Sequence, residues 1–245
     1  MTRRIRVIGI GAGDPEYVTV QAVEALNDVD VFFASDKGDT KDDLVALRRE
    51  VCQRFIREPG YRFVELPDPT RAPTGDYRQR VTDWHEARAD LWAQALRHEL
   101  LDDGVGAFLA WGDPSLYDST LRILDVVAQR LDLTYDVIPG ITAIQALTAR
   151  HRIPLNDVGE PVLITTGRRL RESGLAGSAV VMLDGGCAFL DCPPSTRIWW
   201  GAYLGTPEEI LVDGTVGEVG ERIAAVRAEA RARHGWIMDT YLLRA

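Results

Sequence analysis

Strand patterns and helix patterns alternate along the chain from Arg4 to Arg150. Short apolar runs of strand type are followed by stretches in which apolar residues recur at helical spacing. Strands joined by helical crossovers run parallel, so the sequence predicts an α/β fold with a mostly parallel, doubly wound sheet. The expected strands are 4–9, 31–35, 61–66, 105–111 and 134–138; the expected helices are 20–29, 40–55, 77–100, 116–131 and 141–150.

The remaining part of the chain, after Arg150, has strand patterns that are more closely spaced and only one helix pattern. Strand patterns at 162–166, 179–183, 197–204, 210–216 and 236–243 are interrupted by one helix pattern at 218–234. Strands at such short spacing favour a mixed or antiparallel sheet. Pro154 and Gly159 interrupt the pattern between the two parts, so we expect two α/β domains, residues 1–154 and 155–245.

Composition excludes several classes of partner. The formal net charge of −9 argues against a general nucleic-acid surface, which needs a basic field. No apolar run has the length of a membrane span, and the start of the chain is too glycine-broken for a signal peptide, so we expect a cytoplasmic protein. Cys52, Cys187 and Cys192 have neither disulfide-framework nor zinc spacing, and no metal is expected.

The loop after the first expected strand is rich in glycine, with Gly9, Gly11 and Gly13 at alternate positions. A dinucleotide fingerprint needs a third glycine where Asp14 stands. A phosphate-binding P-loop needs a lysine that the loop lacks. An acidic residue also disfavours phosphate electrostatically. Taken alone, Asp14 before Pro15 is more typical of a helix cap.

Three further motifs follow in order: WGDPSLY at 111–117, VIPGITA at 137–143, and GTPEE at 205–209 with DGTV at 213–216. Together with the first loop, this ordered set resembles the tetrapyrrole methylase family. The resemblance covers nearly the whole chain. It implies S-adenosylmethionine as cofactor, bound in a cleft between two domains, an anionic tetrapyrrole as substrate, and a homodimer.

The segments 31–50 and 61–92 are similar to one branch of that family. The similarity implies methylation of C1 of precorrin-5 with loss of the C20 acetyl group as acetate, giving precorrin-6A. A methyltransferase acting at another ring carbon, such as C11 or C20, is the alternative within the family. A nicotinamide-dependent dehydrogenase, with Asp36 binding the ribose, and a non-catalytic tetrapyrrole carrier are alternatives from other classes.

The resemblance also implies site residues. Those expected at the cofactor are Ala12, Trp111, Gly112, Asp113, Leu116, Thr142, Ala143, Met182 and Gly205. Many relatives have proline at the position of Ala12. Release of acetate calls for a general base, for which the candidates are Asp14, Asp36 and Tyr117, with Lys37 stabilising developing charge. Candidate ligands of the substrate carboxylates are Arg71, Arg78, Arg80, Arg88, Arg168 and Arg169. Some of these residues, taken singly, also fit a structural role. Asp113 fits a helix cap, Met182 fits core packing, and Asp36 with Lys37 fits a solvated pair in a loop.

Overall fold

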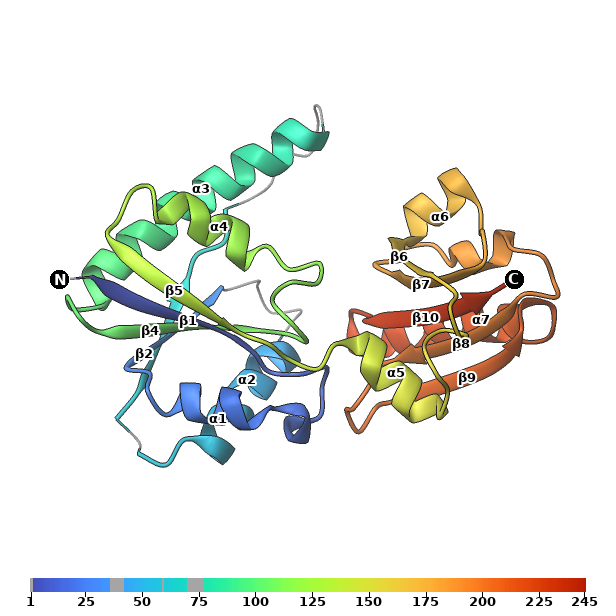
Figure 1. Cartoon of the computed structure of the whole chain (residues 1–245), viewed down its shortest axis with the longest axis horizontal. Helices are drawn as coiled ribbons and strands as arrows, with labels where there is room; N and C mark the ends of the chain where they lie inside the picture. The colour runs from blue at the N-terminus through green and yellow to red at the C-terminus, as the bar shows by residue number, and fades with distance from the viewer. Residues whose placement is uncertain (1, 36–41, 59, 70–76) are drawn as a thin grey trace. The chain divides into compact units, whose positions relative to one another are not determined.

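Two five-stranded sheets organise the residues that the computed structural model describes, which are 2–35, 42–58, 60–69 and 77–245. Figure 1 shows the two sheets with their helices. One unit comprises residues 1–11 and 15–141, and the other comprises 12–14 and 142–245. The expected boundary at 154/155 lies after helix α5 (Ala143–His151), whereas the observed division lies before it, because α5 packs on strands of the second sheet.

The first sheet is parallel throughout, as the alternating pattern predicted. Its strand order is β3-β2-β4-β1-β5, and every neighbouring pair is parallel. The strands are β1 (Arg3–Gly9), β2 (Val31–Ser35), β3 (Arg62–Leu66), β4 (Val105–Ala110) and β5 (Leu133–Ile138). In a parallel sheet the carboxyl ends of the strands meet at one edge, so the loops after β4, β1 and β5 are neighbours.

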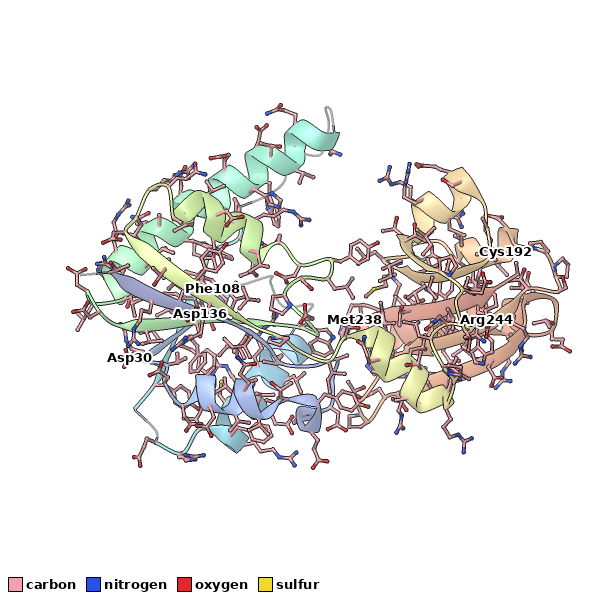
Figure 2. The ribbon with its side chains drawn as sticks, viewed as in Figure 1. Asp30, Phe108, Asp136, Cys192, Met238 and Arg244 are labelled. Carbon is pink, nitrogen blue, oxygen red and sulfur yellow. The ribbon has the colours of Figure 1, made fainter. Side chains whose placement is uncertain are left out.

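Helices cover both faces of this sheet (Figure 1): α1 (Val20–Leu26) and α2 (Asp42–Phe55) lie on one, α3 (Tyr77–Glu99) and α4 (Thr120–Val127) on the other. Apolar residues at alternate positions of β1 fill the two cores, with Ile5 and Val7 facing α3 and α4 and Ile8 facing α1 and α2. Phe108, labelled in Figure 2, stacks on Trp92 of α3 at a centroid distance of 4.2 Å.

Helix α4 is shorter than the expected helix at 116–131. The residues before it form a turn, in which Leu116 N–H donates to the Asp113 carbonyl at 3.2 Å. Tyr117 then adopts a left-handed conformation with φ of 52°, which is incompatible with a regular right-handed helix. The Asp118 carboxylate accepts from Thr120 N–H at 2.7 Å, and the helix begins there.

The second sheet is mixed, again as expected. Its order is β6-β7-β10-β8-β9, in which β6 and β7 are parallel and the other neighbours are antiparallel. The strands are β6 (Val162–Thr166), β7 (Ser178–Met182), β8 (Arg197–Ala202), β9 (Ile210–Thr215) and β10 (Asp239–Arg244). Helix α6 (Gly167–Ser173), which the helical pattern did not predict, follows β6 directly.

Helices α5 and α7 (Val216–His234) cover opposite faces of the second sheet. Trp200 of β8 is fully buried in the core beneath α7. Its neighbour Gly201 faces α5, since a Cβ added there would meet the Leu147 side chain at 3.0 Å. Two short 3₁₀ helices, Pro15–Tyr17 and Ala188–Asp191, complete the elements in the described part of the chain. No helix among the described residues is long and apolar enough to span a membrane.

Candidate functional site

Glycines bring the backbone together where β1, β4 and β5 end. Gly11 and Gly112 form an isolated bridge, with N–H to carbonyl distances of 3.3 Å and 2.8 Å. A Cβ on Gly9 would lie 2.6 Å from the Gly140 nitrogen, and one on Gly140 would overlap the Gly112 carbonyl oxygen. Only glycine permits this approach. We call these four residues, Gly9, Gly11, Gly112 and Gly140, the glycine edge.

Asp113 ties the loop after β4 to the glycine edge. One carboxylate oxygen accepts from Gly140 N–H at 2.8 Å, and the other accepts from Ser115 N–H at 2.8 Å and from the Ser115 hydroxyl. Partial burial alone would raise the pKa of Asp113, but the hydrogen bonds from Ser115 and Gly140 outweigh it and hold that pKa below its ordinary value. The carboxylate is therefore ionised at neutral pH and braces two loops.

The other expected residues of this unit lie beside Asp113. Trp111 and Leu116 are half-buried, and Gly112 is buried. Tyr117 is 44% exposed, and partial burial raises the pKa of its phenol. Tyr117 therefore remains protonated at neutral pH and is suited to donate a hydrogen bond, rather than to act as the base expected from the sequence.

The second unit has a comparable edge. Strands β7 and β8 both run antiparallel to β10, which lies between them, so their carboxyl ends meet at one edge of the sheet. Met182 is half-buried at the end of β7. After β8, Gly205 N–H donates to the Glu209 carboxylate at 2.9 Å. Arg150 of α5 pairs with Glu209 at 2.5 Å and fixes this loop further.

The segment Ala12–Asp14 groups with this second unit. Ala12 is 1% exposed, and a Cβ on Gly13 would overlap the carbonyl oxygen of Leu204 in the loop after β8. Asp14 is half-buried. It does not cap α1, because the N-cap of that helix is Thr19, whose hydroxyl accepts from Ala22 N–H at 3.0 Å.

Thr142 and Ala143 begin helix α5. Thr142 is the N-cap in a capping box: its hydroxyl accepts from Ile144 N–H at 3.1 Å, and its own N–H donates to Gln145 at 3.1 Å. Ala143 is the first residue of the helix and is half-buried. The geometry gives Thr142 a capping role that is compatible with contact to a ligand.

Left-handed backbone gathers in these loops. Among the described residues, positive φ angles in non-glycine residues occur at Tyr117, Leu183, Cys187, Tyr203, Asp103 and Arg152. The first four follow β4, β7 or β8. Such conformations cost free energy, and they persist where the surrounding structure imposes them, which is common at ligand sites. The strain therefore marks the ends of β4 and β8, which carry sequence motifs, and the end of β7, which carries Met182.

The charge of these loops is one-sided. Loops 11–17, 111–117, 139–143, 182–187 and 203–209 contain no arginine or lysine. Their acidic residues are Asp14, Glu16, Asp113, Asp184, Glu208 and Glu209. Arg54 and Arg150 reach Glu16 and Glu209 from neighbouring helices. Loops without basic side chains are poorly suited to the phosphates of a dinucleotide.

Two of the expected catalytic residues, Asp36 and Lys37, lie outside the described residues, as does Arg71. Arg80 is half-buried on α3, the helix that also carries Arg78. Arg88 is buried and binds Asp68 through two hydrogen bonds of 2.7 Å and 3.2 Å. Arg168 and Arg169 are exposed on α6, where both pair with Glu172.

Sequence reasoning missed two acidic residues that organise the second unit. Asp184 and Glu209 both accept hydrogen bonds from loop backbone. Leu183-Asp184-Gly185-Gly186 has the Asp-Gly composition of a tight turn, which could have indicated a specific conformation. Glu209 stands in the GTPEE motif, but its role in holding the loop was not visible there, because its partner Arg150 is distant in sequence.

Comparison with known proteins agrees with these motifs. A family profile described as Tetrapyrrole (Corrin/Porphyrin) Methylases matches residues 4–220. Precorrin-6A synthase (deacetylating) of Sinorhizobium sp is 52% identical over 248 residues, covering 99% of this chain and 95% of that protein.

Solved structures agree as well. The crystal structure of a cobalamin synthesis related protein (CobF) from Corynebacterium diphtheriae superposes with a TM-score of 0.87 at 44% identity, covering 100% of this chain and 99% of that one. A uroporphyrin-III C-methyltransferase from Thermus thermophilus, complexed with S-adenosylhomocysteine, shares the fold with a TM-score of 0.64 at 19% identity, covering 98% and 97% of the two chains. The profile spans most of the sequence, and this chain therefore belongs to the tetrapyrrole methylase family.

Proposed function

We propose that the chain is an S-adenosylmethionine-dependent C-methyltransferase of cobalamin biosynthesis that converts precorrin-5 to precorrin-6A. It would methylate C1 and release the C20 acetyl group as acetate. The observation that carries this proposal is the 52% identity, over nearly the full length, to an enzyme named precorrin-6A synthase (deacetylating). That similarity favours the C1 reaction over methylation at C11 or C20.

S-adenosylmethionine is the methyl donor of the family, and when bound it supplies an electrophilic methyl group on a positively charged sulfur. The loops contain no arginine or lysine that would repel such a group. We assign its binding to the cofactor residues named from the resemblance. The glycine edge and Asp113 would hold the loops in place before binding, which lowers the cost of ordering them.

The substrate carries several carboxylates, for which exposed arginines are natural ligands. Arg168 and Arg169 are the strongest candidates among the described residues. Their side chains are 70% and 61% exposed, and their pairs with Glu172 are of the weak surface type. A substrate carboxylate could replace Glu172 at little cost. Arg88 is a poor candidate, since its guanidinium is already bound to Asp68.

Release of acetate requires water to add to the acetyl carbonyl. The bond from that carbon to the macrocycle then breaks, acetate leaves with the water oxygen, and the macrocycle keeps the electron pair. Asp14 is the candidate base among the described residues. Tyr117, kept protonated by its raised pKa, would donate to the acetyl oxygen. Asp36 and Lys37 remain candidates for base and charge stabilisation. We also propose that the protein is cytoplasmic and forms a homodimer.

The deciding experiment incubates the protein with precorrin-5 and S-adenosylmethionine carrying a labelled methyl group, followed by mass spectrometry. We expect one labelled methyl in the product and one acetate per turnover. Methyl gain without acetate would assign the enzyme to another ring position. Binding of a nicotinamide dinucleotide, with no methyl transfer, would favour the dehydrogenase. Pigment binding without any mass change would favour a carrier. Asp14→Ala should slow acetate release; an unchanged rate would remove Asp14 as the base.

A further inference from the structure

Asp184 is a buried carboxylate in the turn that follows β7. Its side chain accepts three hydrogen bonds: from Gly186 N–H at 3.0 Å, from Ala188 N–H at 2.6 Å, and from the Tyr241 hydroxyl at 2.7 Å. The residue is 4% exposed. Two of these donors belong to its own turn, so Asp184 fixes the backbone of the turn from within.

The turn that Asp184 holds is conformationally unfavourable. Leu183 and Cys187, on either side of it, have positive φ angles of 53° and 56°. Neither residue is glycine, so each conformation is costly and must be imposed by the surroundings. Leu183 directly follows Met182 and is 66% exposed. Leu183 thus presents an apolar side chain from a strained backbone, and strained conformations of this kind cluster at ligand sites.

Neighbouring elements hold Asp184 from outside the turn. Arg227 of α7 donates to the Asp184 carbonyl at 2.5 Å and to Asp239 of β10 at 2.9 Å. Asp239 also accepts from the Trp200 indole at 2.9 Å. Burial and the adjacent Asp184 carboxylate raise the pKa of Tyr241, which keeps that phenol as a donor. The turn is thus joined to α7, β8 and β10 by one hydrogen-bond network.

The first residue of α6 makes room for this carboxylate. A Cβ on Gly167 would lie 2.7 Å from the Cβ of Asp184 and would overlap its carboxylate oxygen. Glycine is a poor helix former, and alanine would favour the helix. Gly167 therefore fits this place because Asp184 occupies the adjoining space. Thr166 caps the same helix through a hydrogen bond to Arg169 N–H at 3.4 Å.

We propose that Asp184 is a positioning residue for the cofactor: it holds Leu183 in the left-handed conformation and thereby fixes Met182 and Leu183 where they contact S-adenosylmethionine. This inference rests on the proposed function, which assigns Met182 to the cofactor. It adds Leu183 as a contact of the cofactor, and it adds Asp184 as the residue that holds Leu183 in the binding-competent conformation before the cofactor binds. Without Asp184, a smaller fraction of molecules has the binding-competent turn, and the apparent dissociation constant rises in inverse proportion to that fraction.

The test compares Asp184→Asn with Asp213→Asn. The amide NH2 group of an asparagine at 184 would face either the N–H of Gly186 or, in the other orientation, both the N–H of Ala188 and the Tyr241 hydroxyl, so at least one hydrogen bond is lost. Asp213 is an exposed carboxylate on β9 in the same unit, paired with Arg197 at 3.2 Å. Calorimetry would measure the Kd for S-adenosylhomocysteine, and steady-state kinetics would measure KM and kcat. We expect Asp184→Asn to raise Kd and the KM for S-adenosylmethionine by about tenfold, with kcat within about twofold. Asp213→Asn should change neither.

Two further variants keep the test decisive if Asp184→Asn does not fold. Tyr241→Phe removes one donor to Asp184, and Gly167→Ala displaces its carboxylate from the side of α6. Both should raise Kd with little change in kcat. Gly220→Ala is the control for Gly167→Ala: its Cβ would meet only side chains, nearest the flexible end of Leu190 at 3.0 Å.

Folded variants that bind S-adenosylhomocysteine as tightly as the wild type would overturn the proposal. A roughly tenfold loss of kcat in these variants, with the KM for S-adenosylmethionine unchanged, would overturn it as well. A wild-type protein that binds no S-adenosylhomocysteine would instead refute the proposed function, and with it the basis of this inference. Leu183→Ala supplies the direct test of the added contact and should raise Kd without changing the thermal midpoint.

Discussion

The carboxylate of Asp113 accepts a hydrogen bond of 2.8 Å from the backbone N–H of Gly140. This contact joins the loop after β4 to the end of β5, two strands that are not neighbours in the sheet, since β1 lies between them. The same carboxylate accepts from Ser115. One acidic side chain thus sets the relative position of two loops that the family resemblance assigns to the cofactor.

Asp113→Ala should weaken both the fold and the binding of S-adenosylhomocysteine. It leaves the half-buried N–H of Gly140 without its acceptor, which costs about 1–3 kcal/mol. Urea unfolding and calorimetry would measure the two effects. Asp90→Ala is the control, since the Asp90 side chain is 74% exposed and pairs with Arg130 at the surface. Equal effects of the two substitutions would contradict the bracing role of Asp113.

The stabilisation by Asp113 should depend on pH in a defined direction. Its pKa is lowered in the folded protein, so the ionised form is favoured by folding. The contribution is present above the unfolded pKa of about 3.9 and is lost as pH falls through the folded pKa. The difference in unfolding free energy between wild type and Asp113→Asn should therefore be constant from about pH 8 to 5 and shrink below about 4. A difference that grows on acidification would show the opposite sign.

Gly140→Ala should be among the most damaging small substitutions in the chain. The added methyl group would overlap the Gly112 carbonyl oxygen, a backbone atom that can move only with β4 and its loop. We expect a loss of at least about 2 kcal/mol in unfolding free energy and a large loss of cofactor affinity. Gly60→Ala, where a Cβ would meet no atom within 4 Å, should be neutral. Thermal melts and S-adenosylhomocysteine titrations of both variants decide the matter.

Most of the helices and strands were predictable, because the spacing of apolar residues along the chain shows which side of each element is buried. Strands 31–35 and 162–166 were predicted with the observed bounds, as their apolar runs end at clear breaks. Helix α6 was missed, since it begins with Gly167 and exposes two successive arginines. The expected helix at 116–131 began too early because apolar spacing does not reveal the left-handed Tyr117. Local backbone strain leaves little trace in a hydrophobic pattern.

The motifs predicted which residues belong to the candidate site, but they did not predict which partners those residues contact. Family resemblance pointed to Asp113, but its hydrogen bond to Gly140 depends on parallel strands bringing distant loops together. Arg88 has the charge of a substrate ligand, and only its burial against Asp68 shows another role. Asp184 stood in a turn-like sequence, yet its partners Tyr241 and Arg227 come from the far end of the chain. Such long-range partners cannot be read from one sequence.

Arg168 and Arg169 should contribute to binding of the substrate and not of the cofactor. The double substitution to alanine removes two exposed charges, so we expect the KM for precorrin-5 to rise about tenfold, in line with one or two charge-assisted hydrogen bonds. The Kd for S-adenosylhomocysteine should be unchanged. Arg233→Ala, an exposed arginine paired with Glu229 at 2.6 Å on α7, is the control. A rise in the cofactor Kd, without a change in the substrate KM, would reassign the two arginines.

Arg88→Ala should destabilise the first unit. The Arg88 side chain is 5% exposed, binds Asp68 in a bidentate pair, and lies 4.2 Å over the Trp84 ring. Trp84 in turn donates to the Pro69 carbonyl at 2.9 Å. Together these contacts hold the chain that leaves β3 against α3. Removing one partner leaves the Asp68 carboxylate uncompensated, and we expect a loss of about 3 kcal/mol.

The comparison for this variant is Arg97→Ala on the same helix. Arg97 is exposed and donates to the Arg130 carbonyl at 2.7 Å, so its loss should cost less than about 1 kcal/mol. Urea unfolding followed by near-ultraviolet circular dichroism would report on the packing of the aromatic side chains, Trp84 and Trp92 among them. If Arg88 served the substrate instead, Arg88→Ala would unfold at the wild-type urea midpoint and raise only the KM for precorrin-5. Its bidentate pair and its burial beneath Trp84 argue for the structural outcome.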